Sequence, residues 1–160
     1  MCEQSFSIYG KIVACKDETL SINLNMIRRI HVLEDDSDIR DVIEYLLKDE
    51  GYELQLSSSF SELKLKLRDS LPDLFLVDVM LPDGNGIEIC TDLKNDMFTK
   101  HIPVIVMSAN PRSKQLSAGA CADDYISKPF DVNDVVQRID NLLDKKGSSV
   151  KKDATNESVK

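Results

Sequence analysis

Apolar residues follow two alternating patterns between residues 28 and 146. Short runs that are almost entirely apolar predict buried strands, and longer stretches with apolar residues every three or four positions predict helices with one buried face. The short runs predict five strands, at residues 29–33, 53–56, 74–79, 103–107 and 124–127. A stretch with helical spacing follows each run, so the sequence predicts five strand–helix units in succession.

The first and last predicted helices have the clearest patterns. The first has five apolar residues on one face, namely Ile39, Val42, Ile43, Leu46 and Leu47. Ser37 is expected as its N-cap and Gly51 as its C-terminal cap. We expect Asp131 to cap the last helix. That helix is expected to bury a similar stripe, namely Val132, Val135, Val136, Ile139, Leu142 and Leu143.

Three further helices are expected between these two. One covers residues 59–69 and buries Phe60, Leu63 and Leu67. Another follows a loop at residues 82–86 and buries Ile87, Cys90 and Leu93. The remaining helix is expected between Pro111 and Gly119.

Alternation of strands and helices implies right-handed crossovers and a parallel sheet that is covered on both faces. The sequence therefore predicts a doubly wound α/β domain over residues 28–146. Residues 1–27 show no clear pattern and are expected to form an N-terminal extension. Residues 147–160 are polar and are expected to be a disordered tail.

Composition narrows the class of protein. The chain has 160 residues and a formal net charge of -8, so its overall field does not attract nucleic acid or an anionic membrane. No secretory signal and no membrane-spanning run is evident, and we expect a cytoplasmic protein. The four cysteines are far apart in the sequence and are expected to be reduced thiols, namely Cys2, Cys15, Cys90 and Cys121.

Four of the five predicted strands bring a charged or hydroxyl residue to their carboxyl ends. These residues are Glu34 and Asp35 on the first, Asp78 on the third, Ser108 on the fourth and Lys128 after the fifth. Ligands of open α/β sheets bind at this edge, so we expect these side chains to meet there. Taken singly, Ser108 and Lys128 are also compatible with ordinary surface residues.

Asp78 is the most informative of these residues, because it interrupts an otherwise apolar strand. A buried carboxylate without a partner is costly. Several carboxylates in one crevice repel each other, and a hard divalent cation, Mg²⁺ or Mn²⁺ in its place, relieves that repulsion. One carboxylate then becomes a nucleophile toward a phosphoryl group. Asp36, by contrast, is well placed to help cap the first helix.

Taken together, these residues resemble the response-regulator receiver family of two-component signalling, of which the chemotaxis response regulator is the simplest member. The resemblance covers about residues 28–145. It rests on four segments, namely HVLEDDSDIR (31–40), LFLVDVMLPDGNGIE (74–88), PVIVMSA (103–109) and DYISKPF (124–130). It implies a flavodoxin-like sheet of five parallel strands in the order 2-1-3-4-5.

The resemblance also implies a role for each matching residue. Asp78 resembles the phosphoacceptor of the family. Asp35 is expected to bind the metal directly and Glu34 through water, while Asp78 contributes a carboxylate oxygen and Met80 its backbone carbonyl.

Three residues match the parts of the family that respond to the phosphoryl group. Ser108 stands in the place of the hydroxyl switch residue, and Tyr125 resembles the switch aromatic that turns inward after phosphorylation. Lys128 resembles the lysine of the site, and its bond to Pro129 is expected to be cis. The face formed by the fourth helix, fifth strand and fifth helix is expected to change shape with them.

Partners are expected from the resemblance alone. The phosphodonor would be a sensor histidine kinase or a histidine phosphotransfer protein, and the output would be an unidentified protein target. We expect a stand-alone receiver that does not contact nucleic acid or a membrane directly. The sequence does not decide whether the protein forms a homodimer. Residues 1–25 are expected to be an extension from an upstream start site or a cloning addition.

Two other functions are compatible with parts of this pattern. A phosphohydrolase of the haloacid dehalogenase type also uses a strand-end aspartate as nucleophile. A resemblance to that family would require the motif Asp-x-Asp, in which the second Asp is the general acid. Met80 stands at that second position here and cannot act as an acid. A degenerate receiver that works without phosphate would lack an acidic residue, the hydroxyl or the lysine, and all are present. The protein is therefore expected to be a signalling phosphoacceptor and not an enzyme, with slow self-dephosphorylation at most.

Overall fold

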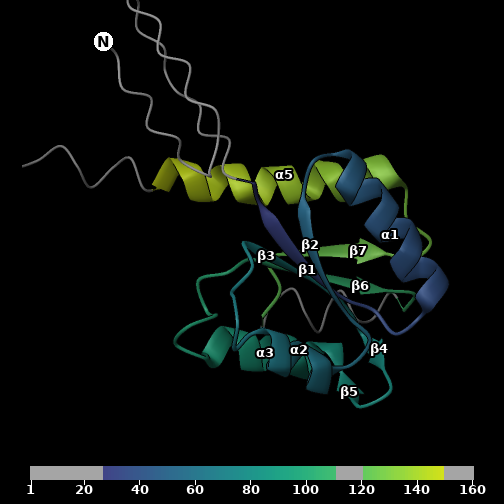
Figure 1. Ribbon diagram of the computed structural model, residues 1–160, viewed down its shortest axis with the longest axis vertical. Helices are drawn as coiled ribbons and strands as arrows, with labels where there is room; N and C mark the ends of the chain where they lie inside the picture. The colour runs from purple at the N-terminus through teal and green to yellow at the C-terminus, as the bar shows by residue number, and fades with distance from the viewer. Residues whose placement is uncertain (1–26, 111–120, 150–160) are drawn as a thin grey trace, which may run out of the picture.

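The computed structural model describes residues 27–110 and 121–149. Its main sheet has five parallel strands in the order β2-β1-β3-β6-β7 (Figure 1). The strands are β1 (Arg29–Leu33), β2 (Glu53–Ser57), β3 (Leu74–Asp78), β6 (Val104–Ser108) and β7 (Asp124–Ser127). Counted along the sheet strands alone, this is the predicted order 2-1-3-4-5, and the predicted fold class is confirmed.

Four described helices cover the two faces of this sheet. Figure 1 shows α1 and α5 on one side and α2 and α3 on the other. They are α1 (Ser37–Asp49), α2 (Phe60–Lys66), α3 (Gly86–Asn95) and α5 (Val132–Ser149). The helix predicted between Pro111 and Gly119 lies outside the described residues, as do residues 1–26 and 150–160.

Residues of the central strand alternate between two apolar clusters. Leu74 and Leu76 of β3 pack in the cluster beneath α1 and α5. Phe75 and Val77 pack in the cluster beneath α2 and α3. All four are fully buried, because successive side chains of a strand point to opposite faces and both faces are covered here. Both faces of β3 are therefore covered, and its carboxyl end lies at the edge of the sheet where ligands of such folds bind.

The ends of α1 differ in one detail from the prediction. Asp36, and not Ser37, is the N-cap, because its carboxylate accepts hydrogen bonds from the backbone N–H groups of Asp38 and Ile39. At the other end Gly51 has a φ of 86° and terminates the helix, as predicted. The Gly51 N–H donates to Lys48 O and the Tyr52 N–H to Leu47 O, which is the Schellman arrangement.

Several boundaries and faces were predicted wrongly. Val42 is 51% exposed, because it lies about 100° around the helix from Ile43, which is buried. The second helix ends at Lys66, earlier than predicted, and α5 continues three residues beyond residue 146. The expected loop at residues 82–86 instead contributes to a short antiparallel hairpin and the first turn of α3. The hairpin pairs β4 (Met80–Leu81) with β5 (Gly84–Asn85).

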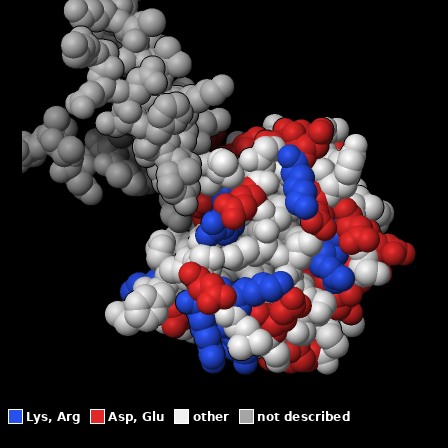
Figure 2. Space-filling view, in the orientation of Figure 1, with Lys and Arg blue, Asp and Glu red and all other residues white. Residues whose placement is uncertain are grey.

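Charged side chains are frequent on the face that Figure 2 shows. In the view of Figure 2, acidic and basic side chains are interspersed over the visible face. Among the helices of the described residues, none is long and apolar enough to cross a membrane.

Candidate functional site

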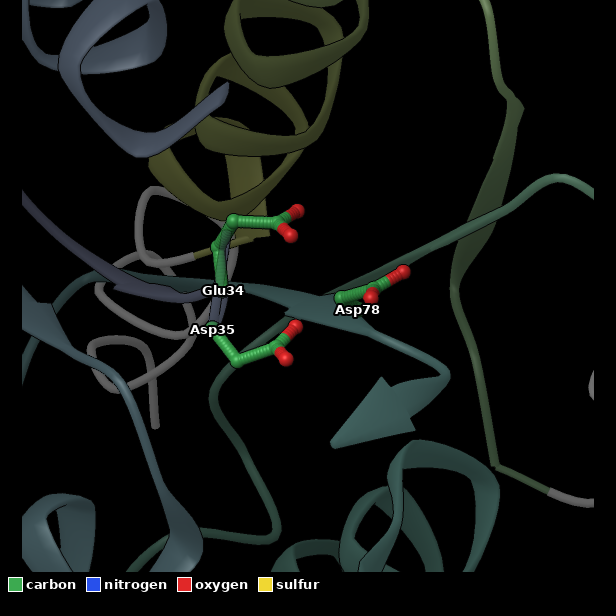
Figure 3. A group of neighbouring side chains, drawn as sticks. All are labelled: Glu34, Asp35 and Asp78. Carbon is green, nitrogen blue, oxygen red and sulfur yellow. The ribbon is translucent and has the colours of Figure 1, made fainter. Parts of the chain in front are cut away.

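The acidic residues predicted at the strand ends meet in the structure. Glu34 and Asp35 follow β1, and Asp78 is the last residue of β3, the neighbouring strand. One carboxylate oxygen from each residue lies within 4.8 Å of the others. Figure 3 shows the three side chains pointing into the same space at the carboxyl edge of the sheet. This spacing suits a single hard cation held by several oxygen ligands.

Lys128 joins two of these carboxylates. Its Nζ lies 2.6 Å from Glu34 Oε2 and 3.0 Å from Asp78 Oδ1. The Lys128 N–H donates to Ser108 O at 2.9 Å, so the backbone beside β6 places this side chain. The Lys128–Pro129 peptide bond is cis, as predicted. One ammonium group is thereby shared between two buried acids.

Burial dominates the electrostatics of the two acids. Glu34 is 1% exposed and Asp78 4% exposed. Burial raises the pKa of both carboxyl groups, and Lys128 only partly offsets this increase. Burial also opposes the charge of Lys128, but its two ion pairs outweigh that effect and raise its pKa. The ammonium is therefore charged, whereas burial opposes ionisation of the two carboxyl groups that share it.

Glu34 has a carboxylate oxygen that could bind a cation. Its Oε2 pairs with Lys128, whereas its Oε1 is buried and makes no hydrogen bond within the described part of the chain. A buried carboxylate oxygen without a partner is costly. The residues present therefore fit a divalent cation, with Glu34, Asp35 and Asp78 as the oxygen donors.

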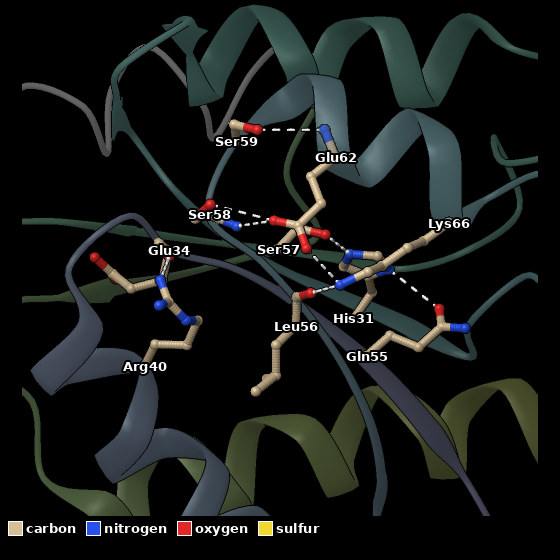
Figure 4. A network of polar contacts seen from close by, with 10 residues as sticks. All are labelled: His31, Glu34, Arg40, Gln55, Leu56, Ser57, Ser58, Ser59, Glu62 and Lys66. Carbon is tan, nitrogen blue, oxygen red and sulfur yellow. Dashed lines mark hydrogen bonds and ion pairs between the residues drawn. The ribbon is translucent and has the colours of Figure 1, made fainter.

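The backbone of the acidic pair is held from two sides. The Glu34 N–H donates to Ser57 O at 3.0 Å. The Arg40 guanidinium donates to Glu34 O at 2.7 Å (Figure 4). It also donates to Asp35 O at 3.3 Å. Arg40 was not singled out from the sequence, although it lies one turn into α1, where a long side chain reaches back to the end of β1. It fixes the backbone from which two candidate ligands project.

A polar network lies behind Glu34, between β1 and β2. His31 Nε2 is 2.8 Å from Ser57 Oγ, and His31 Nδ1 is 3.2 Å from Gln55 Oε1 (Figure 4). Burial is the largest effect on His31 and lowers its pKa to about 4. His31 is therefore neutral at pH 7, and it holds the same serine whose carbonyl accepts from Glu34.

Gly86 supports Asp78 from the other side. The Gly86 N–H donates to Val79 O at 2.9 Å, and a Cβ on Gly86 would lie only 2.0 Å from Asp78 O. The start of α3 therefore reaches the backbone of Asp78 only because residue 86 has no side chain. Sequence reasoning missed this role, although the Gly-Asn-Gly segment after the third predicted strand pointed to a close approach.

Met80 lies beside the site with its side chain in solvent. It is 73% exposed and pairs with Asn85 across the hairpin. The exposed side chain agrees with the expectation that only the backbone of this residue serves the site. Metal binding through the Met80 carbonyl stays a prediction.

Ser108 and Tyr125 lie together at the ends of β6 and β7. Ser108 is 1% exposed, and its Oγ accepts from the Asn110 N–H at 3.0 Å. Tyr125 is 9% exposed, and its hydroxyl lies within donor distance of Ser108 O, at 3.2 Å, and Asn110 O, at 3.0 Å. The tyrosine is thus already turned inward here. Its predicted movement on phosphorylation stays a prediction.

The family follows from a comparison with known sequences. The sequence profile described as "response regulator receiver domain" matches residues 30–140, which is more than half of the chain. The chain belongs to the response regulator receiver family. Receiver domains take phosphoryl groups from histidine kinases, and the family binds Mg²⁺ in its active site.

Similar proteins support this assignment. The phosphate regulon transcriptional regulatory protein PhoB of Escherichia coli (strain K12) is 37% identical over 122 residues, which are 74% of this chain and 52% of PhoB. The chain thus spans about half the length of the curated relatives it matches.

Solved structures agree with the fold. A putative response regulator from Chloroflexus aurantiacus J-10-fl has a TM-score of 0.71 and 28% identity, covering 74% of this chain and 98% of that one. A CheY-like receiver domain protein from Methanospirillum hungatei JF-1 has the same TM-score and identity, covering 77% and 98%.

Proposed function

We propose that this receiver domain accepts a phosphoryl group on Asp78, with Mg²⁺ held by Glu34, Asp35, Asp78 and the carbonyl of Met80. The observation that supports this most strongly is the meeting of three carboxylates within 4.8 Å, two of which share the ammonium of Lys128. Mn²⁺ has similar ligand preferences and is expected to substitute.

Transfer begins with attack by a carboxylate oxygen of Asp78 on the phosphorus atom of the donor. The bond from phosphorus to the donor nitrogen of a phosphohistidine breaks, and its electron pair stays on that nitrogen, which takes up a proton. The divalent cation supplies charge neutralisation for the transferred phosphoryl oxygens. Lys128 already lies 3.0 Å from Asp78 and adds a second positive charge at the same place.

The response to phosphorylation is proposed to begin at Ser108. Its hydroxyl would donate to a phosphoryl oxygen, and the backbone at Ser108 would shift toward Asp78. Because the Tyr125 hydroxyl bonds Ser108 O and Asn110 O, this shift changes the support of the tyrosine. The surface formed by β7 and α5 is proposed to change shape in consequence.

The domain is proposed to act as a signalling phosphoacceptor and not as an enzyme. Met80 stands two residues after Asp78 and offers no carboxyl group as the general acid of a phosphohydrolase. The proposed donor is a sensor histidine kinase or a histidine phosphotransfer protein, in the cytoplasm. The proposed output is contact with a protein target, without direct binding of nucleic acid or membrane.

The test is a measurement of intact mass after incubation with Mg²⁺ and acetyl phosphate. The wild-type chain should gain the mass of one phosphoryl group, and Asp78→Asn should gain none. Asp83→Asn is a matched control, because Asp83 is an exposed aspartate five residues away. Its carboxylate accepts hydrogen bonds from the N–H groups of Phe60 and Ser61 at the start of α2, where the asparagine side chain can still accept one. A gain of mass in Asp78→Asn equal to that of the wild type would refute the proposal.

A further inference from the structure

Two cysteines that are far apart in the sequence meet beside α3. Cys90 lies on the buried face of α3 and is fully buried, whereas Cys121 lies just before β7 and is half-buried. Both thiols belong to the apolar cluster under α2 and α3. Burial raises the pKa of the Cys90 thiol, and the neighbouring Cys121 raises it further.

Contacts on either side hold the two segments in register. One turn before Cys90, the carbonyl of Ile87 accepts a hydrogen bond from Cys121 Sγ at 3.7 Å. One turn after it, Lys94 Nζ forms an ion pair of 2.5 Å with Asp123. Residues 87, 90 and 94 share one helix face, because they are three and four positions apart. Residues 121–123 are thereby aligned along α3 at the level of Cys90.

Asp123 is itself fixed to the sheet. Its carboxylate accepts a hydrogen bond from the Val104 N–H at 2.8 Å, at the start of β6. Lys94 also donates to Ile102 O at 2.9 Å. The neighbourhood of the two thiols is therefore built from the sheet and α3, which hold the segment of Cys121 beside the helix that carries Cys90.

We propose that Cys90 and Cys121 form a reversible disulfide bond when the protein meets a peroxide. This bond would form whether or not Asp78 accepts a phosphoryl group. Disulfides of reducing compartments are transient and are commonly redox-sensing. The bond would join α3 covalently to the segment that leads into β7.

The half-buried thiol is the point of attack. Cys121 sulfur takes one oxygen atom from hydrogen peroxide, the O–O bond breaks, water leaves, and Cys121 becomes a sulfenic acid. Cys90 sulfur then attacks Cys121 sulfur, the S–O bond breaks, and the hydroxyl group leaves as water with the proton of the Cys90 thiol. Two thiols and one peroxide give one disulfide and two waters.

The different surroundings of the two thiols fix this order. Burial raises the pKa of Cys90, so its reactive thiolate is scarce and it is a poor first target for an oxidant. The position of Cys121 beside α3 compensates for this in the second step, because the contacts with Ile87 and Lys94 hold the two segments together before the reaction. Cys90 is therefore expected to react only after Cys121 has been oxidised.

The test uses the full chain, treated with hydrogen peroxide and then alkylated in denaturant, digested and weighed without reduction. The proposal predicts one cross-linked peptide pair containing Cys90 and Cys121, which dithiothreitol separates. Cys121→Ser should leave Cys90 as a free thiol that is alkylated after unfolding. Cys90→Ser should leave Cys121 as a sulfenic acid that dimedone traps.

A double variant, Cys2→Ser with Cys15→Ser, is the matched control and should keep the cross-link. Cys121→Ala provides a second variant at the half-buried position if Cys90→Ser fails to fold. Oxidation of Cys121 to sulfinic acid while Cys90 stays alkylatable would overturn the proposal. Pairing of Cys121 with Cys2, with Cys15 or with another chain would overturn it as well.

Discussion

Gly86, the first residue of α3, lies against the backbone of Asp78 so closely that a Cβ atom would sit 2.0 Å from the carbonyl oxygen of Asp78. The same Cβ would lie 2.8 Å from the Cα of Val79. Both obstacles are backbone, so they cannot rotate away as a flexible side chain would. The position of the candidate phosphoacceptor therefore depends on a glycine eight residues further along the chain.

The first prediction is that Gly86→Ala destabilises the fold and impairs the site. Overpacking of this kind costs about 1–3 kcal/mol. Urea unfolding measures the loss, and the rate of phosphorylation by acetyl phosphate should decrease as well. Gly84→Ala is the control, because a Cβ there would meet the Ile89 side chain at 3.6 Å (Cδ1) and 3.9 Å (Cγ1), which are ordinary contacts. Equal stability of the two variants would show that the start of α3 moves freely away from Asp78.

The second prediction concerns Lys128. Lys128→Met removes the ammonium that Glu34 and Asp78 share, and it leaves two buried carboxylates without a protein cation. The rate of phosphorylation should decrease by about 100-fold or more, as when a preorganised charge is removed from a site. Lys100→Met changes an exposed lysine and should leave the rate unaltered. An unaltered rate in Lys128→Met would mean that this ammonium has no part in transfer.

The third prediction follows from the raised pKa of Asp78. Without metal, the folded chain keeps a proton on Asp78 that the unfolded chain has already lost, so this group favours folding at low pH. That contribution decreases as pH rises from about 4 through the raised pKa. In EDTA, Asp78→Asn should therefore be more stable than the wild type at pH 7 by roughly 1.4 kcal/mol per unit of pKa shift.

The comparison of the wild type with Asp78→Asn isolates the effect of this carboxyl group on stability, because all other acidic residues are the same in both proteins. Chemical unfolding at pH 4 and pH 7 should show a difference that nearly vanishes at the lower pH. Mg²⁺ should stabilise the wild type at pH 7 and reduce the advantage of Asp78→Asn. A variant less stable than the wild type at pH 7 in EDTA would contradict the direction of the pKa shift.

The fourth prediction is that Arg40 controls metal affinity without touching the metal. Arg40→Ala removes the hydrogen bonds to Glu34 O and Asp35 O and frees the backbone that carries both side chains. Loss of such a supporting contact weakens metal affinity by about 10–100-fold. Titration calorimetry with Mg²⁺ measures the change, and Arg68→Ala, at an exposed position on the other side of the sheet, is the control. Equal affinities in the two variants would refute the role.

Much of the fold was predictable because each buried strand of a doubly covered sheet is a short, continuous apolar run in the sequence. The third and fourth sheet strands are continuous apolar runs, which only a sheet buried on both faces requires. The residues of the site were predictable for a related reason. Glu34, Asp78 and Lys128 lie at strand ends, and strand ends of a parallel sheet meet at one edge.

The features that the sequence did not predict depend on contacts between segments in the folded chain. Gly86 matters because of a backbone contact with Asp78, and no periodicity marks such a contact. Arg40 has the spacing of an ordinary surface arginine, and only the path of α1 turns it toward β1. The β4–β5 hairpin has two residues in each strand, too few for a pattern of alternation.

The most direct test of the central claim is to locate the phosphoryl group chemically. An aspartyl phosphate is an acyl phosphate, and borohydride reduces its carbonyl to a primary alcohol, which converts that aspartate into homoserine. After treatment with Mg²⁺ and acetyl phosphate, peptide sequencing by mass spectrometry should find homoserine at position 78 and nowhere else. Homoserine at Asp35 in place of Asp78, or at neither residue, would contradict the assignment of Asp78 as the phosphoacceptor.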